Sequence, residues 1–353
     1  MNARDLGIAI GDLEPGPLNA ITDVAGVRVG HTTLVDGDSV RTGVTVVLPT
    51  ADGTPCFAAP HRLNGNGELT GLEWVRESGF LTTPIGITNT FSVGVVRDAI
   101  VASQHRANRG RWHLPVVGET YDGFLNEIEA MHVRDQHVFA ALEAATDGPV
   151  EQGAVGGGTG MICHGFKGGI GTASRAAGEH RVGVLVQANH GARRRLQIDG
   201  VPVGRELGPE RVPALTEPDA GDGGGSIIVL VATDAPLLPH QCARLAHRAA
   251  LGIARTGGAG ENSSGDLLLA FAVGNRFSAA ADEPVPLTMV PNERLNPLFY
   301  AAIEATEEAI VNALVAAETM TGRGGATAYA LPHDALREVM QAGGRRRPQQ
   351  RHP

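Results

Sequence analysis

A serine that follows a run of glycines is the residue in this sequence with the clearest capacity for chemistry. Residues 219–225 (DAGDGGG) tolerate left-handed backbone conformations, and the apolar run that begins at Ser226 predicts a buried strand. A hydroxyl at the first position of such a strand could attack the carbonyl carbon of Gly225, because Gly225 has no side chain in the way. An N→O acyl shift followed by hydrolysis would then release Ser226 with a free α-amine.

The free α-amine is what would make Ser226 a nucleophile without help from a histidine. Its reference pKa of ~7.7–8 lets it act at neutral pH as general base for the serine hydroxyl. The spacing alone leaves open the simpler interpretation that residues 219–225 form a flexible loop before a strand.

Metal and nucleotide chemistry have weaker support in the sequence. The 13 histidines show no HExxH or His-carboxylate spacing, and residues 156–160 (GGGTG) lack the GK[ST] ending of a phosphate-binding loop. We interpret residues 156–160 as a close-packed glycine loop that lines the nucleophile pocket. We therefore expect neither a metal nor another cofactor.

Composition narrows the class of protein further. The net charge of −9 argues against a nucleic-acid partner, and no stretch has the ~18 uncharged apolar residues that a membrane span needs. With 4% aromatic residues and 48 glycines, the core must consist mainly of small aliphatic side chains. Cys56, Cys163 and Cys242 are too scattered for a disulfide framework, so we expect a soluble, cytoplasmic protein.

The elements that must position Ser226 alternate between strands and helices along the whole chain. Short β-branched runs predict strands near residues 27–30, 43–48, 84–88, 182–186 and 227–232, and 3.6-residue periodicity predicts helices over 137–145, 239–254 and 296–318. No linker divides them. We expect one α/β domain over residues 1–353, with stacked sheets between helical layers and a disordered tail at 341–353.

Nine stretches resemble, in order, the DmpA-type aminopeptidases (L-aminopeptidase/D-Ala-esterase/amidase), which are related to the β-peptidyl aminopeptidases. They are PGPLNAITDVAGVRVG (15–30), RTGVT (41–45), LNGNGELTG (63–71), TNTFSVGVVRDA (88–99), ETYDGFLN (119–126), VGGGTGMICHGFKGGIGTASR (155–175), VLVQANHG (184–191), GSIIVLVATDAPLLPHQ (225–241) and SSGDLLLAF (263–271). The resemblance implies an αββα sandwich like that of N-terminal-nucleophile hydrolases, with a different connectivity. It also implies cleavage between Gly225 and Ser226 into an α chain of residues 1–225 and a β chain of residues 226–353, and a homo-oligomer, a tetramer of αβ units.

The resemblance assigns roles to five residues besides Ser226. Tyr121 matches the family's active-site tyrosine, which serves proton transfer, and Glu119 is a plausible anchor for the substrate's ammonium group. Asn189 matches the oxyanion donor, and Ser264 with Asp266 matches a pair that orients the nucleophile. The β-peptidyl branch has Glu where this chain has Asp266, which leaves the role of this shorter carboxylate in doubt.

The implied activity is that of a self-processing serine aminopeptidase and amidase. It would release N-terminal amino acids from small peptides, amides or esters through an acyl-enzyme on Ser226. The overall likeness, including residues 236–241 (PLLPHQ), favours the DmpA branch over the β-peptidyl branch.

Two alternatives remain open from the sequence. One is an acyltransferase that resembles the self-cleaving ornithine acetyltransferases, which use Thr at the position of Ser226. The other is an uncleaved, non-catalytic binding protein that has kept the fold and lost the chemistry.

Overall fold

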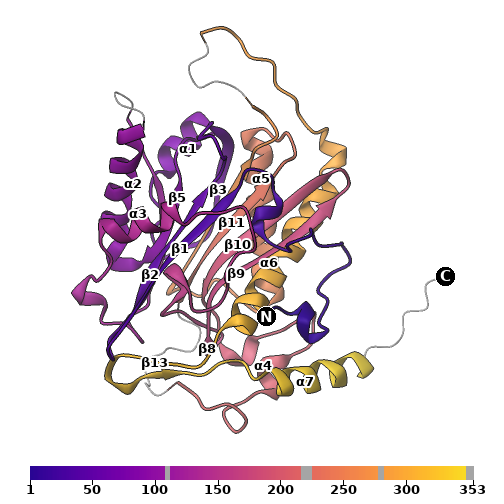
Figure 1. Ribbon diagram of the computed structural model, residues 1–353. Coiled ribbons are helices and arrows are strands. Elements are labelled where there is room, and N and C mark those ends of the chain that lie inside the picture. Colours follow the sequence, from indigo (N-terminus) through magenta and orange to yellow (C-terminus); the bar gives the residue numbers. More distant parts are fainter. Residues whose placement is uncertain (108–111, 216–224, 277–281, 347–353) are drawn as a thin grey trace, which may run out of the picture.

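Two β-sheets are stacked face to face between two layers of helices in the computed structural model, which describes residues 1–107, 112–215, 225–276 and 282–346 (Figure 1). The expected glycine loop at 219–224 therefore lies outside the described residues, whereas Gly225 and Ser226 lie within them.

The smaller sheet has four strands in the order β1-β2-β5-β6, and the larger has six in the order β4-β3-β12-β11-β10-β9. The first comprises β1 (Arg28–Asp36), β2 (Val40–Leu48), β5 (Ile85–Asn89) and β6 (Val116–Thr120). The second comprises β4 (Phe80–Leu81), β3 (Cys56–Gly65), β12 (Ser264–Ala272), β11 (Gly225–Thr233), β10 (His180–Asn189) and β9 (Gly169–Ala177).

The helices cover the outer faces of both sheets. The four-stranded sheet packs against α2 (Val93–Ala107) and α3 (Asp135–Glu143), and the six-stranded sheet against α5 (Pro239–Arg255) and α6 (Asn296–Ala316). The remaining elements are shorter or peripheral: α1 (Leu72–Ser78), α4 (Val203–Glu206), α7 (His333–Arg346), the pair β7 (Ile162–Cys163) and β8 (Phe166–Lys167), and the pair β13 (Met320–Thr321) and β14 (Thr327–Ala328).

Three hydrophobic cores hold the four layers together, as stacked amphipathic elements require. Ile87, Ile228 and Leu230 belong to the core between the sheets. Val96 belongs to the core under α2 and α3, and Leu245 belongs to the core under α5 and α6. The expected αββα sandwich is therefore confirmed, as are the five strands and three helices predicted from periodicity.

The 3.6-residue periodicity of α6 is typical of a helix with one apolar face, but this helix is covered on nearly all sides. Glu304 and Glu308, which fall partly off its apolar stripe, are buried and accept hydrogen bonds from the guanidinium of Arg175. Arg175 comes from β9 and is itself fully buried, so the carboxylates are paired inside the protein.

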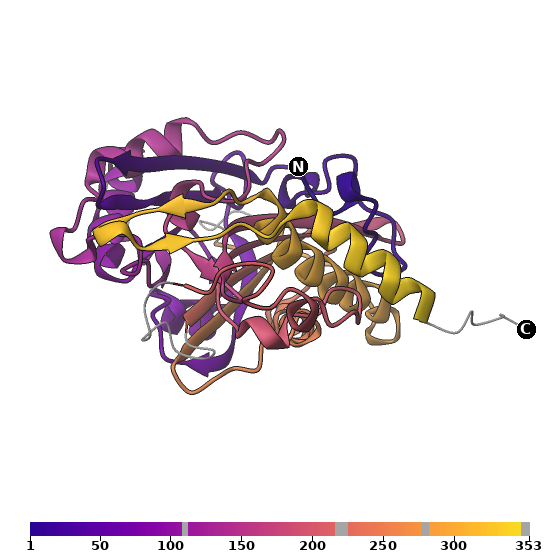
Figure 2. The same ribbon diagram turned by 90° about the horizontal axis from the view of Figure 1, so that it is seen from below.

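The C-terminal segment lies across one end of the sandwich, where β13, β14 and α7 follow one another (Figure 2). Helix α7 continues to Arg346, so residues 341–346 of the expected tail extend this helix, while residues 347–353 lie outside the described part. Leu336 and Val339 on α7 are buried, and this packing sustains the helix into a Gly- and Arg-rich stretch.

Strand β11 lies in the middle of the larger sheet, antiparallel to β10 and parallel to β12. The start of β11, the start of β12 and the end of β10 therefore meet at the same edge of the sheet. Within the described ranges, no helix has the length and apolar character that a membrane crossing needs.

Candidate active site

Ser226 is the second residue of β11 and lies between two neighbouring strands. It faces Asn189 across the antiparallel ladder and Gly265 across the parallel one. The backbone N–H of Gly265 donates a hydrogen bond to Ser226 Oγ at 3.1 Å, and only 6% of the serine is exposed. The hydroxyl oxygen is therefore held in place by main-chain geometry at an almost closed site.

Gly225 has a backbone conformation that a residue with a side chain could hardly adopt. Its φ is +129°, and a Cβ atom at this position would lie 2.0 Å from the carbonyl oxygen of Asn189. Both the left-handed conformation and the close strand contact require glycine immediately before the serine.

Asn189 ends β10 beside Ser226, and its amide is oriented by two backbone groups. The N–H of Ile162 donates to Asn189 Oδ1 at 2.7 Å, and Asn189 Nδ2 donates to the carbonyl of Tyr121 at 3.0 Å. An amide nitrogen carries two hydrogens, so one donor remains for a reacting oxygen. The preceding contacts fix this donor before any charge develops.

Ser264 and Asp266 flank Gly265 at the start of β12. The hydroxyl of Ser264 donates to Asp266 Oδ1 at 2.6 Å, and both side chains are buried. Burial raises the pKa of Asp266 to about 6, an effect that the nearby Glu261 carboxylate increases and the Ser264 hydrogen bond opposes. The shorter carboxylate of Asp266 therefore does reach Ser264 in this chain.

Asn64 holds the turn before β12 in position. Its Nδ2 donates to the carbonyls of Glu261 and Ser264, and the neighbouring Asn66 Nδ2 donates to the carbonyl of Ser263. The LNGNG stretch of β3 thus fixes the backbone that presents Ser264 and Gly265.

Glu119 reaches the site from the other sheet. Gly118 lets β6 pack closely over β11, since a Cβ there would lie 3.0 Å from Ile228 Cδ1. Glu119 Oε1 accepts from the backbone N–H of Glu68 at 2.9 Å, and Oε2 accepts from the hydroxyl of Thr90. Burial raises the pKa of Glu119, and these two hydrogen bonds oppose the shift.

Gly67 lies between Glu119 and the start of β12. A Cβ at Gly67 would lie 3.0 Å from Glu119 Oε1 and 3.1 Å from the Cα of Gly265, the residue that binds Ser226 Oγ. The buried carboxylate of Glu119 is therefore separated by a single glycine from Gly265 of β12, the strand beside that of Ser226, and a side chain at position 67 would fill that space.

Tyr121 joins the site through its backbone, because its carbonyl accepts the hydrogen bond from Asn189. Its side chain is 49% exposed, and the phenol lies against Gly123, where a Cβ would come within 2.2 Å of the hydroxyl oxygen. The next residue, Asp122, is fully buried and accepts hydrogen bonds from Asn89 and Asn126, which anchors this segment.

The structure thus places Ser226 against Asn189 and Gly265, and Ser264 against Asp266. The backbone of Tyr121 contacts Asn189, and a single glycine, Gly67, separates Glu119 from Gly265. Sequence reasoning missed Gly265, Asn64, Gly67 and Thr90. The quoted LNGNG and TNTF stretches contained three of these residues, but nothing in their spacing indicates which backbone groups they contact. The glycine loop at 156–160 packs between the sheets, where a Cβ on Gly157 would lie 2.6 Å from the carbonyl oxygen of Ile87.

The stacked sheets, with a serine at the start of a central strand and an oriented amide beside it, define a serine hydrolase of the N-terminal-nucleophile type. Residues 19–328 match the profile of peptidase family S58, and the chain belongs to this family. It is a serine aminopeptidase, an enzyme that hydrolyses peptide bonds.

Similar proteins agree with this assignment. β-Peptidyl aminopeptidase BapA of Sphingosinicella microcystinivorans is 47% identical, over 96% of this chain and 91% of that protein. The structure of a Burkholderia sp. β-aminopeptidase superposes with a TM-score of 0.91 at 53% identity, covering 99% of this chain and 100% of the other. L-Aminopeptidase D-Ala-esterase/amidase from Ochrobactrum anthropi, described as a prototype of the serine aminopeptidases and a new variant of the Ntn hydrolase fold, superposes with a TM-score of 0.90 at 42% identity, covering 98% and 99%.

These figures correct one expectation. Identity is higher to the Burkholderia β-aminopeptidase than to the Ochrobactrum enzyme, 53% against 42%, so the likeness is not closer to the DmpA branch. The acyltransferase and the non-catalytic binding protein are not favoured by the family assignment.

Proposed function

We propose that Ser226 is both the self-cleavage site and the catalytic nucleophile of this aminopeptidase. The single observation that carries the proposal is the hydrogen bond from Gly265 N–H to Ser226 Oγ, beside the oriented amide of Asn189. Ser226 Oγ attacks the Gly225 carbonyl, the peptide nitrogen leaves as the α-amine, and water hydrolyses the resulting ester. The products are an α chain of residues 1–225 and a β chain of 128 residues, 353 minus 225.

In turnover the new α-amine takes the proton from Ser226 Oγ as the hydroxyl attacks the substrate carbonyl. The free Nδ2 hydrogen of Asn189 stabilises the oxyanion, and Ser264 with Asp266 orients the amine and hydroxyl. The α-ammonium then protonates the leaving amine, and water releases the acyl group from Ser226. Tyr121 assists this proton transfer by turning its exposed phenol toward the leaving group.

Glu119 explains why the enzyme acts on amino termini. A substrate with a free amine brings one positive charge into a nearly closed site, and the buried Glu119 carboxylate is the partner that this charge needs. We infer that the substrates are short peptides, amides and esters with a free amine. The two relatives named β-peptidyl aminopeptidase and β-aminopeptidase favour β-amino acids among them.

Denaturing gels and a substrate panel test these two parts separately. Purified wild-type protein should give two bands of about two thirds and one third of the mass, the smaller starting at Ser226, while Ser226→Ala should remain one chain without amidase activity. A panel of L-, D- and β-amino-acid p-nitroanilides should show turnover of β-amino-acid substrates. A single intact wild-type band, or activity in Ser226→Ala, would show that the nucleophile is wrong.

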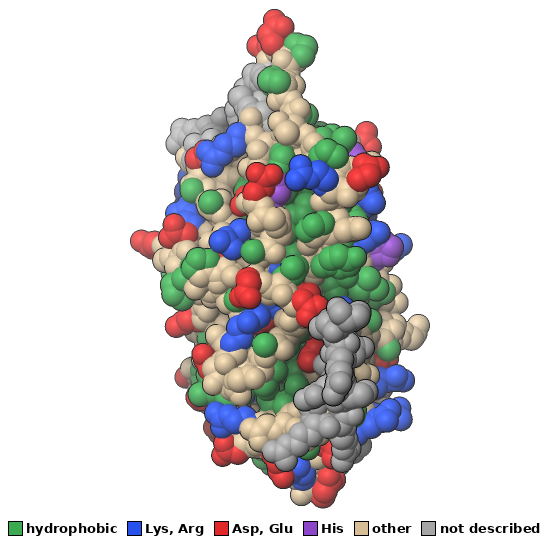
Figure 3. Space-filling view, turned by 90° about the vertical axis from the view of Figure 1, so that its right-hand side faces the viewer, with side chains coloured by type: hydrophobic (Ala, Val, Ile, Leu, Met, Phe, Trp, Pro, Cys, Tyr) green, Lys and Arg blue, Asp and Glu red, His purple; other side chains and the backbone are tan. Residues whose placement is uncertain are grey.

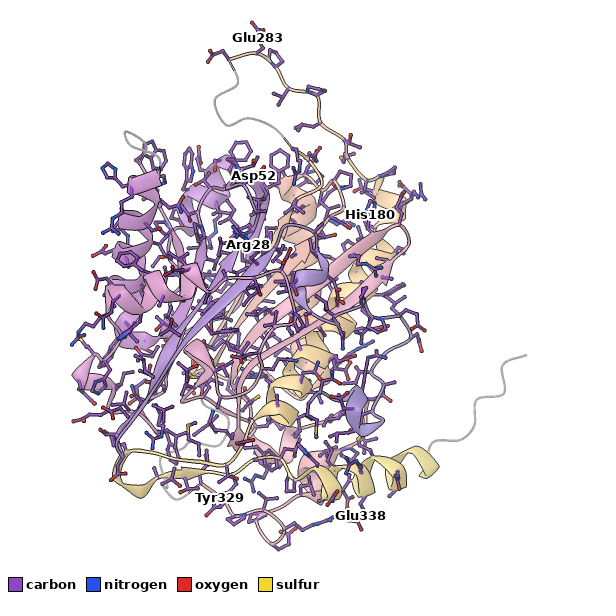
Figure 4. All side chains as sticks on the ribbon, viewed as in Figure 1. Arg28, Asp52, His180, Glu283, Tyr329 and Glu338 are labelled. Atoms are coloured by element: carbon purple, nitrogen blue, oxygen red, sulfur yellow. The ribbon has the colours of Figure 1, made fainter. Side chains whose placement is uncertain are left out.

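An extended arm supports the further proposal that αβ units assemble into a homotetramer. Residues 282–289 are exposed and stand out from the body, with Glu283 at the tip (Figures 3 and 4). Val285, Leu287 and Met289 are exposed along the arm, and such side chains are typical of surfaces that a second copy covers. Sedimentation of a single αβ unit would contradict this. The compartment we propose is the cytoplasm, in keeping with three free, buried cysteines.

A further inference from the structure

Two histidines and a cysteine meet in a buried cluster directly behind Asn189. Cys163 and His164 come from the β7–β8 hairpin, and His190 follows β10. One possible ligand atom from each lies within 4.8 Å of the other two, and Cys163 Sγ is 3.9 Å from His190 Nδ1. All three residues are at most 2% exposed.

His164 occupies an unusual backbone position for its residue type. It forms a two-residue turn with Gly165, with φ values of +49° and +67°, and such turns favour Asn, Asp or Gly. The backbone N–H of His164 donates to the carbonyl of His190 at 2.7 Å, which fixes the turn against the end of β10. A non-glycine residue held in this conformation suggests that its side chain has a use there.

The imidazole of His164 is prepared to accept a ligand. Its Nδ1 lies 3.2 Å from the carbonyl oxygen of Ala192, so Nδ1 must be the protonated nitrogen. Nε2 is then a bare lone pair, and it has no hydrogen-bond partner among the described residues. A backbone carbonyl that accepts from one ring nitrogen, and so fixes the tautomer, is characteristic of histidines that bind metals through the other nitrogen.

The imidazole of His190 is also incompletely paired. Its Nε2 is buried without a hydrogen-bond partner in the part of the chain that the structure describes. Gly191 and Gly258 make room for the two rings: a Cβ on Gly191 would lie 2.3 Å from His164 Cε1, and one on Gly258 3.1 Å from His190 Nε2. A buried unpaired nitrogen is costly, so an ion that accepts the lone pair of His164 Nε2 would relieve that side chain, while His190 faces Cys163 through Nδ1.

The ligand set and its charge select the ion. One thiolate and two neutral imidazoles suit soft or borderline metals, above all Cu⁺ and Zn²⁺. The cluster of Cys163, His164 and His190 contains no carboxylate. Cu⁺ with one thiolate is neutral, whereas Zn²⁺ with the same three ligands would leave a net positive charge inside the protein.

The separation of Cys163 and His190 agrees with two ligands of a trigonal site. Bonds of ~2.3 Å to sulfur and ~2.0 Å to nitrogen place the two ligand atoms about 3.7 Å apart at a trigonal angle and about 3.5 Å apart at a tetrahedral one. The observed 3.9 Å between Cys163 Sγ and His190 Nδ1 is nearer to the trigonal value.

We propose that Cys163, His164 and His190 form a binding site for one Cu⁺ ion, and that occupancy lowers turnover by shifting Asn189. His190 follows Asn189 in sequence, and Cys163 follows Ile162, whose N–H orients the Asn189 amide. On the other side, the backbone N–H of Lys167 in β8 is tied to the carbonyl of Tyr329, which lies at the lower end of the molecule in Figure 4. The Lys167 end of the hairpin is therefore fixed. When the three ligands close around an ion, the Cys163 end moves, and this end contacts the proposed oxyanion donor. Binding releases the Cys163 thiol proton to solvent and leaves the copper as Cu⁺.

The experiment measures copper directly and activity separately. Cleaved wild-type enzyme is incubated anaerobically for hours with Cu⁺ and a reductant, since a buried site fills slowly, and bicinchoninate competes for the ion. We expect one Cu⁺ per αβ unit. Cys163→Ala and His164→Asn should each weaken copper binding, and asparagine is chosen because it tolerates the positive φ at position 164. The loss should exceed the ~10–100-fold that follows removal of a group that only orients a ligand. Cys242→Ala removes a buried thiol that donates to the carbonyl of Phe57 at 3.8 Å, and this control should bind copper like wild type.

Four results would overturn the proposal: no Cu⁺ bound, binding unchanged in both site variants, tighter binding of Zn²⁺ than of Cu⁺, or an unchanged kcat at full occupancy. The first three concern the site and the last its link to Asn189. Because copper stoichiometry is measured without substrate, failure of this proposal is distinguishable from failure of the nucleophile assignment.

Discussion

The substitution Asn189→Ala removes an amide that makes two hydrogen bonds and, in our proposal, offers a third to the reacting carbonyl oxygen. The two observed bonds join Asn189 to the N–H of Ile162 and to the carbonyl of Tyr121. At ~1 kcal/mol for each, their loss should destabilise the protein by about 2 kcal/mol. Loss of an oxyanion donor should lower kcat by ~100–1000-fold, about 2.7–4 kcal/mol of transition-state stabilisation.

Asn312 on α6 provides a matched control for the structural part. It is fully buried, accepts a hydrogen bond from the N–H of Ala3 at 2.8 Å and donates one to the carbonyl of Thr172 at 2.8 Å. Asn312→Ala therefore removes the same kinds of bonds far from Ser226. We expect similar losses of thermal stability in the two variants, and a loss of kcat only in Asn189→Ala.

The assay is p-nitroanilide hydrolysis at saturating substrate, with rates normalised to the amount of free β chain on a denaturing gel. Normalisation separates an effect on turnover from an effect on self-cleavage. The reasoning is refuted if Asn189→Ala keeps kcat within about threefold of wild type, or if Asn312→Ala loses as much kcat as Asn189→Ala.

Two further predictions concern the start of β11 and the start of β12. Gly225→Ala should accumulate uncleaved chain, because its Cβ would meet the Asn189 carbonyl at 2.0 Å and its φ of +129° suits only glycine; normal processing on a time-course gel would contradict this. For Asp266, kcat/KM should fall as pH is lowered through about 6, since the protonated acid is a poorer acceptor for Ser264, and Asp266→Asn should abolish this limb of the pH profile. Because the pKa of Asp266 is raised in the folded protein, its ionisation lowers the stability of the fold as pH rises through about 6. Asp266→Asn should therefore melt at a higher temperature than wild type at pH 8. A lower melting temperature would show that the hydrogen bond of the carboxylate outweighs the cost of its burial.

Local pattern was enough to find the buried strands and the serine at the start of one of them. Runs such as residues 227–232 are apolar on both faces, and only a strand covered by layers on both sides accounts for them. The same reasoning could not reveal Gly265 as the partner of Ser226, because the β11–β12 pairing is parallel and joins segments 39 residues apart. A parallel register depends on the intervening helix and on the layers around it.

Buried charge was the second limit on what the sequence could predict. Glu304 and Glu308 are off the apolar stripe of α6, and their burial depends on Arg175, a residue of β9 more than a hundred positions away. Spacing in the sequence did not reveal the cluster of Cys163, His164 and His190 for the same reason. The β7–β8 hairpin and the end of β10 bring the three residues together, and they do not have the regular spacing of ligands on one helix. Residues 341–346 continue α7, whose apolar face packs on the body.

The topology explains how Ser226, the nucleophile in our proposal, can also be a chain terminus. Because β12 is parallel to β11 and β10 is antiparallel, the beginnings of β11 and β12 and the end of β10 lie at one edge of the sheet. A cut before Ser226 leaves β11 held by both ladders, so its new α-amine stays beside Gly265 and the Ser264–Asp266 pair instead of fraying. In an edge strand the same cut would free the terminus on one side. In our proposal, the central position of β11 is therefore what allows self-cleavage to create a base at a fixed distance from its own hydroxyl.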